Sequence, residues 1–150
     1  MARVDFYHLT RDPAPAVLAR LASRVLAGGD RLLVVAAGRD QREAVDAGLW
    51  AAIPESFLPH PPVDHPGAEA AQEPILIAAD VATPANGARL IALADGEWRD
   101  EALGFDRVFL LFDGAGIDGA RAAWKSLSKR EGVDCHYWRQ DQSGRWQEGP

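Results

Sequence analysis

Short runs of almost wholly apolar residues, separated by segments with helical spacing, constrain the fold of this 150-residue chain more than any other feature. Residues 31–37 and 107–112 are the clearest of these runs, and residues 75–78 form a shorter one. A strand that is apolar along its whole length is typical of a parallel sheet covered on both faces. We therefore expect a central sheet between layers of helices.

Three segments repeat their apolar residues at helical spacing. The first follows Asp12-Pro13, a favourable N-cap and first-turn pair, and ends at Gly28-Gly29. The second spans about residues 40–51, and the third about residues 118–131. Strands that alternate with helices favour right-handed crossovers and a mostly parallel sheet. We predict a single α/β domain over residues 1–150, three-layered and doubly wound.

Further strands and one irregular segment complete the expected order of elements. Strands are predicted at residues 3–9, 88–93 and 133–139, with an edge strand at 145–147. The stretch from 59 to 74 holds five of the ten prolines. Because proline fixes φ and lacks an amide hydrogen, this stretch is predicted to be a Pro-rich loop.

Composition excludes several classes of protein. The chain is 47% hydrophobic and 25% charged, as in ordinary globular domains, and no run approaches the ~18 apolar residues of a membrane span. The single cysteine, Cys135, cannot form an internal disulfide, which favours a reducing, cytoplasmic setting. A net charge of −6 opposes a protein whose main task is to bind nucleic-acid backbones.

The motifs of nucleotide binding and catalysis that this fold class invites are missing. The first expected strand-to-helix turn, residues 10–13, contains no glycine, whereas a dinucleotide fingerprint needs glycines there. No Gly-x-Ser-x-Gly elbow occurs, and His60 and His65 lack the spacing of metal ligands. We interpret Cys135 as a packed thiol and His8 as an ordinary strand residue. We predict no catalytic residue, no cofactor and no metal site.

The third expected helix carries cations beside an indole. Arg121, Lys125 and Lys129 recur every four residues and form a basic stripe, and Trp124 borders it. Such a surface suits a peptide that ends in a hydrophobic residue and a carboxylate. The alternative is that Trp124 and Ile117 belong to a buried apolar stripe and the cations to a solvated face.

Positive charge is concentrated near the end of the chain. Residues 1–119 hold ten basic and 18 acidic residues, a net of −8, whereas residues 120–150 hold six and four, a net of +2. A locally basic end on an acidic protein suits a small acidic partner better than a long polyanion. Direct binding of single-stranded DNA through Trp138 and Trp146 is an alternative that the acidic remainder opposes.

A second candidate surface joins the second helix to the Pro-rich loop. Leu49 completes the apolar face of that helix, so Trp50 points about 100° away from it. Pro54 and Pro59 bracket Phe57 and stiffen the segment. Large aromatic side chains on a stiff segment offer apolar area with little entropy to lose, as in protein interfaces. Alternatively, they seal one end of the sheet.

Residues 49–60, which read Leu-Trp-Ala-Ala-Ile-Pro-Glu-Ser-Phe-Leu-Pro-His, resemble the chi subunit family of bacterial DNA polymerase III holoenzyme. Residues 6–9, residues 108–112 and the helix that carries Arg121 follow in the family's order, so the resemblance covers nearly the whole chain. It implies a non-catalytic adaptor with a mononucleotide-binding-like fold that binds no nucleotide. The alternative function is an α/β enzyme that binds a nucleotide or phosphate metabolite.

The resemblance also implies partners and site residues. Family members link the clamp-loader assembly to single-stranded-DNA-binding protein (SSB) by holding its acidic, phenylalanine-ending C-terminal tail. The positions that match this tail site are Arg121, Trp124 and Lys125. The other family partner is the psi subunit, and Trp50 and Phe57 match that surface. Nucleic acid would be contacted only through these partners, and no membrane is involved.

The chain departs from the family pattern at the tail site. Trp124 stands where the family also uses tyrosine, and Ile117 where some relatives place a further lysine. Residues 139–150 are too divergent for any role to be carried over. These departures concern the footprint of the tail site more than the role of the protein.

Overall fold

The computed structural model describes residues 2–10, 12–52, 75–81, 87–143 and 145–148. The described strands are β1 (Ala2–His8), β2 (Leu32–Val35), β3 (Ile75–Ala78), β4 (Leu90–Leu93), β5 (Arg107–Phe112), β6 (Val133–Gln140) and β7 (Trp146–Glu148). The described helices are α1 (Ala14–Ala27), α2 (Arg39–Ala52) and α3 (Ile117–Leu127), with short 3-10 helices η3 (Asp100–Gly104) and η4 (Gly114–Gly116).

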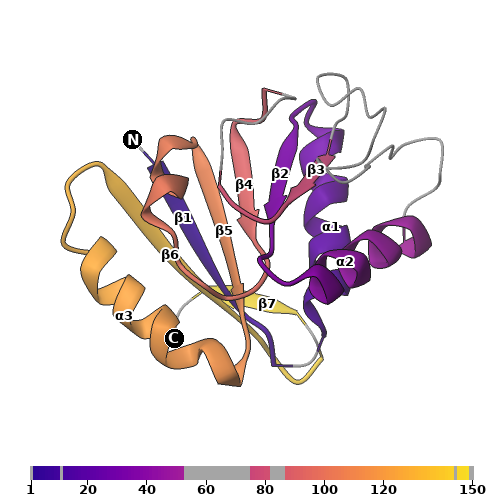
Figure 1. Cartoon of the computed structure of the whole chain (residues 1–150). Coiled ribbons are helices and arrows are strands. Elements are labelled where there is room, and N and C mark those ends of the chain that lie inside the picture. Colours follow the sequence, from indigo (N-terminus) through magenta and orange to yellow (C-terminus); the bar gives the residue numbers. More distant parts are fainter. Residues whose placement is uncertain (1, 11, 53–74, 82–86, 144, 149–150) are drawn as a thin grey trace.

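All seven strands form one sheet in the order β3-β2-β4-β5-β1-β6-β7. Every neighbouring pair is parallel except β6 and β7 at one edge. Helices α1 and α2 cover one face of the sheet and α3 covers the other (Figure 1). The predicted three-layer, doubly wound, mostly parallel architecture is therefore confirmed.

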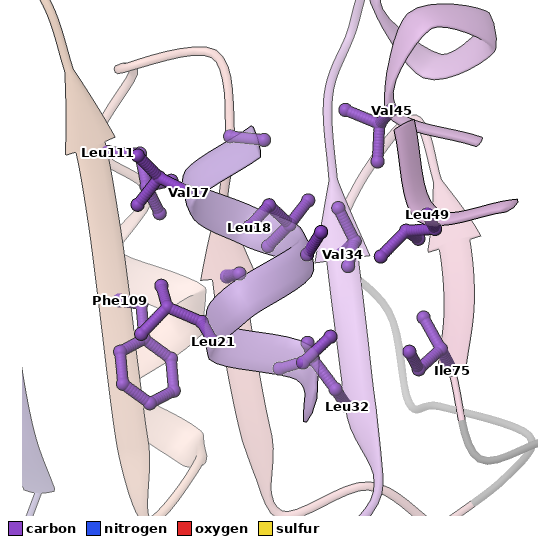
Figure 2. Close-up of a cluster of buried hydrophobic side chains, with 14 of the residues drawn as sticks. Val17, Leu18, Leu21, Leu32, Val34, Val45, Leu49, Ile75, Phe109 and Leu111 are labelled. Carbon is purple, nitrogen blue, oxygen red and sulfur yellow. The ribbon is translucent and has the colours of Figure 1, made fainter. Parts of the chain in front are cut away.

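The larger apolar core lies beneath α1 and α2. Leu18 and Leu21 point from α1 toward the sheet, and Leu49 of α2 is fully buried in the same cluster (Figure 2). The two helices also touch each other closely, because a Cβ built on Gly48 would lie 2.9 Å from the Cβ of Pro15. Only glycine at position 48 lets the helices approach to this distance without a shift.

Two predicted helix boundaries are wrong, and each has a local cause. Pro13, rather than Asp12, is the N-cap residue of α1, and the Asp12 carboxylate instead accepts a 2.6 Å bond from Arg20. Helix α3 ends at Leu127 rather than near residue 131. Beyond it, the Arg130 amide donates to the carbonyl of Leu127, the tighter bonding that closes many helices.

Strand β1 carries a fully buried carboxylate, Asp5, which ties β6 to the centre of the sheet. The Asp5 side chain accepts bonds from Trp138 Nε1 at 3.0 Å, Arg107 Nε at 2.8 Å and the Arg3 guanidinium. Burial alone would raise the pKa of Asp5, but these three donors outweigh it and hold the pKa below its usual value. With Trp138 fixed on this face, Tyr137 points to the opposite face, beneath α3.

Two strands at the centre of the sheet create a topological switch point. Strands β1 and β5 are neighbours, but α1 follows β1 on one face and α3 follows β5 on the other. In doubly wound sheets, ligands bind at the carboxyl ends of such strands. Among the described residues, no helix is long and apolar enough to cross a membrane.

Candidate functional site

A groove of about 400 Å³ opens between α3 and the carboxyl ends of the central strands. Its volume falls within the range of small-ligand pockets. Helix α3 forms one side, and residues from β1, β5 and β6 form the other. The lining residues are His8, Phe112, Ile117, Ala120, Arg121, Trp124, Tyr137 and Arg139.

The strand side of the groove is a cross-strand row fixed by the sheet register. His8 on β1 pairs with Phe112 on β5 and with Arg139 on β6. The His8 ring stacks on Phe112, with ring centroids 5.0 Å apart. The Tyr137 hydroxyl lies 3.2 Å from His8 Nδ1, within hydrogen-bond distance. The floor of the groove is thus held by stacking and a hydrogen bond as well as by the sheet.

Trp124 is both a core residue and a wall of the groove. Its half-buried indole meets the rings of Phe6 and Tyr137 edge to face, at centroid distances of 5.3 and 6.0 Å. The same indole lines the open groove beside Arg121. The core interpretation of Trp124 therefore describes the part of the ring that packs on Phe6 and Tyr137. The remainder of the ring lines the groove, and its role in binding stays a prediction.

Two guanidinium groups make the groove electropositive. Arg121 comes from α3 and Arg139 from β6, both are exposed, and neither forms an ion pair within the described part of the chain. Burial lowers the pKa of His8, and the nearby charge of Arg121 lowers it further. Burial raises the pKa of Tyr137, against the influence of both arginines. Both pKa shifts reflect burial in an apolar groove, and the positive charge of nearby arginines acts on both groups. Such a groove is suited to a ligand that carries a carboxylate next to an apolar side chain.

The predicted tail-site residues fall into two groups. Arg121 and Trp124 line the groove together, whereas Lys125 is exposed on α3 and does not line it. Lys129, the third member of the predicted basic stripe, lies beyond the end of the helix. A ligand in the groove would meet Arg121 and Trp124 directly, and could reach Lys125 only from outside the groove.

The second predicted surface cannot be placed in the structure. Phe57, the Pro-rich loop at about residues 59–74 and its two histidines lie outside the described residues. Helix α2 includes Trp50, but the side chain of Trp50 is likewise not described. The assignment of Trp50 and Phe57 to a protein interface stays a prediction.

Sequence reasoning missed the four lining residues that come from strands: His8, Phe112, Tyr137 and Arg139. The alternating pattern of residues 133–139 placed Tyr137 and Arg139 on one face of a strand, which is correct. It carried no information about the neighbouring strand. Only the pairing of β6 with β1 brings these side chains beside His8 and beneath α3.

A second cavity of about 400 Å³ lies at the switch point itself, where nucleotides bind in many proteins of this architecture. Three acidic residues line it: Asp12, Asp95 and Asp113. Burial alone would raise the pKa of Asp95, but hydrogen bonds from Arg99 and from the Ala37 amide hold it below its usual value. This carboxylate therefore stays anionic and is paired with Arg99. No described residue that lines the cavity supplies a positive charge for a phosphate group.

The start of α1 also departs from a phosphate-binding turn. Anion sites of this kind rely on the free amide hydrogens of the first helical turn. Here Pro13 and Pro15 lack such hydrogens, and the amides of Ala16 and Val17 already donate to the carbonyl of Pro13. Helix α1 offers little to an anion in this cavity.

Comparison with models of protein families identifies a family that matches most of the chain. The model of the DNA polymerase III chi subunit family, HolC, matches residues 1–135. No curated protein matches the chain. The match contains all of α3 and ends within β6, so Tyr137 and Arg139 lie beyond it.

Proposed function

The chain belongs to the DNA polymerase III chi subunit family, and on that basis we propose that the groove beneath α3 binds the acidic, phenylalanine-ending C-terminal tail of SSB. Chi is a non-catalytic accessory subunit of the polymerase III holoenzyme and takes part in bacterial DNA replication. The proposed role is that of an adaptor, which holds SSB with one surface and the clamp-loader assembly with another.

One observation carries this proposal: a half-buried indole lines the same open groove as a guanidinium that forms no ion pair with any described residue. Trp124 and Phe112 supply apolar surface for a hydrophobic side chain, and Arg121 supplies charge for the carboxylate beside it. A peptide that ends in phenylalanine presents both groups on one residue. An internal phenylalanine presents only the ring, so the groove would distinguish a chain end from a chain interior.

The acidic residues before the terminal phenylalanine would lie outside the groove, near two lysines. Lys125 lies on α3 outside the groove, and Lys129 follows the end of that helix. Both side chains are exposed, so they attract acidic residues weakly and through solvent. We therefore expect the terminal residue to supply most of the affinity, and the upstream acids to supply its dependence on salt.

The direct test is calorimetric titration of this protein with two short peptides that end in Asp-Ile-Pro-Phe. One peptide has a free C-terminal carboxylate, and the other has a C-terminal amide. We expect the free acid to bind and the amide to bind at least about tenfold more weakly, since a charged hydrogen bond contributes ~1.5–3 kcal/mol. Equal binding of the two peptides, or no binding of either at low salt, would contradict the proposal.

We place the clamp-loader side of the adaptor at Trp50 and Phe57, as the family resemblance implies. Replacement of either residue by alanine should disrupt binding to a psi-type partner and leave binding of the SSB tail intact. Co-purification of the partner with each variant measures the first effect, and the peptide titration measures the second. Full retention of the partner by both variants would remove this part of the proposal.

A further inference from the structure

We propose that Arg139 of β6, together with Arg121 of α3, holds the terminal carboxylate of the bound peptide. This inference rests on the proposed function of the groove and adds a residue to it. The terminal carboxylate would then be bound from two sides of the groove, by one guanidinium from the helix and one from the sheet. Lys125, which the family pattern indicates, would take part only from outside.

The position of Arg139 in the sheet supports this role. It lies next to His8 in the parallel register of β1 and β6, near the carboxyl ends of both strands. Along β6, Tyr137 and Arg139 alternate with residues that face the opposite side, so both side chains point beneath α3. Arg139 therefore reaches the groove from a rigid element rather than from a loop.

Arg121 and Arg139 are free of ion pairs within the described part of the chain, so both guanidinium groups can take a carboxylate from a ligand. Seven described arginines lie against a carboxylate, whereas Arg24, Arg42 and Arg145 also form no ion pair with a described residue but do not line the groove. The nearest acidic residue in sequence, Asp141, is already engaged by the Ser143 amide and hydroxyl and by the Arg145 amide. The arginines that pair with carboxylates are Arg3, Arg20, Arg39, Arg89, Arg99, Arg107 and Arg130.

Chemistry also favours Arg139 over Lys125 for this contact. A guanidinium offers a planar fork of N–H donors that matches the two oxygens of a carboxylate, whereas an ammonium acts as a point charge. Arg139 lines the apolar groove, where hydrogen bonds to a charged group are less screened than at the open surface. Lys125 does not line it.

The experiment compares three single substitutions by glutamine, each titrated with the free-acid and amidated peptides. Arg121→Gln and Arg139→Gln each remove one groove guanidinium. Arg145→Gln is the matched control, because Arg145 is exposed and does not line the groove. Arg139 is also exposed and has no carboxylate partner in the described ranges, so its replacement should leave the fold intact, which circular dichroism verifies.

We expect Arg139→Gln to weaken binding of the free-acid peptide by about tenfold or more, and binding of the amide by less than about threefold. Arg145→Gln should change either affinity by less than about twofold. This pattern would support a direct contact between Arg139 and the terminal carboxylate.

Three other results would overturn the inference. If Arg139→Gln behaves like Arg145→Gln while Arg121→Gln loses affinity, the proposed function stands and Arg139 has no part in it. If Arg139→Gln weakens the acid and the amide equally, Arg139 acts elsewhere than at the terminal carboxylate. If the unaltered protein binds neither peptide, the proposed function and this inference both fail.

Discussion

Two cavities of similar volume open at the same edge of the sheet, and Phe112 lines both of them. The cavity at the switch point is lined by Asp12, Asp95 and Asp113, whereas the groove beneath α3 is lined by Arg121 and Arg139. The customary ligand site of the architecture thus has no cation among the described residues of its lining, and the neighbouring groove has two. The comparison shows that the side chains at this edge, rather than the fold, determine what it can bind.

The difference also explains how a non-catalytic accessory subunit can retain a mononucleotide-binding-like frame. In a parallel sheet the carboxyl ends of several strands lie at one edge, and any cavity between the loops that follow them can become a binding site. In this protein Pro13 and Pro15 remove amide hydrogens from the start of α1. The available cations lie on the other side of Phe112, where Trp124 provides a wall.

Reversing the charge of the groove should have the largest effect. Arg121→Glu places a carboxylate where the peptide carboxylate is proposed to lie, so we expect the affinity for the free-acid peptide to fall by more than about 100-fold. Because Arg121 is exposed and forms no ion pair with a described residue, thermal unfolding should be nearly unchanged. Arg145→Glu, with the same change of charge outside the groove, should retain most of the affinity.

The two cavities should respond differently to ligands in a thermal shift experiment. At a peptide concentration about 100 times its dissociation constant, the native state gains ~2.7 kcal/mol, which raises the unfolding temperature by roughly 5–10 °C for a chain of this size. ATP at the same concentration should give no shift, because the switch-point cavity is acidic. A shift with ATP and none with the peptide would reverse the assignment of the two cavities.

Trp124→Ala should affect stability and binding together, since the indole serves both. Loss of its edge-to-face contacts with Phe6 and Tyr137 should lower the free energy of unfolding by about 2 kcal/mol. Loss of the groove wall should weaken peptide binding by a similar amount. Chemical denaturation and peptide titration measure the two effects separately, and Trp124→Phe should restore much of the stability. Unimpaired binding by the folded Trp124→Ala protein would exclude the indole from the site.

A smaller effect is expected of His8 on the pH dependence of peptide binding, because a bound carboxylate stabilises the protonated form of its ring. In the free protein, burial and the charge of Arg121 lower the pKa of His8, while Asp113 acts to raise it. Tyr137 and Arg139 face the same ring from β6. Binding an anion raises the pKa of His8, so the complex holds more protons and affinity rises as the pH falls from 8 to 6, by about threefold. His8→Gln should flatten this profile, and an unchanged profile would exclude the coupling.

The sequence predicted the sheet and its covering helices well, because fully apolar runs and helical spacing are local signals. The short runs at residues 75–78 and 107–112 coincide with β3 and β5. Helix ends were less predictable: instead of capping α1, Asp12 accepts bonds from Arg20 of α1 and from Gln140 of β6, and the second of these depends on the tertiary fold.

The groove could be predicted only on its helical side. Arg121 and Trp124 share a helix, so their spacing brings them together. His8 lies more than a hundred positions before Phe112 and Arg139 in the chain. The three residues meet because β1 lies between β5 and β6 in the sheet. No local pattern encodes that order.

The most direct test of the central claim is solution NMR of the protein with labelled indole and guanidinium nitrogens, observed as the free-acid peptide is added. We expect the Nε1–H signal of Trp124 and the Nε–H signals of Arg121 and Arg139 to shift. The Nε1–H signal of Trp98, which is bonded to Asp100 and does not line the groove, should stay in place. A peptide that binds without moving the Trp124 signal would contradict the assignment of the groove as the site of recognition.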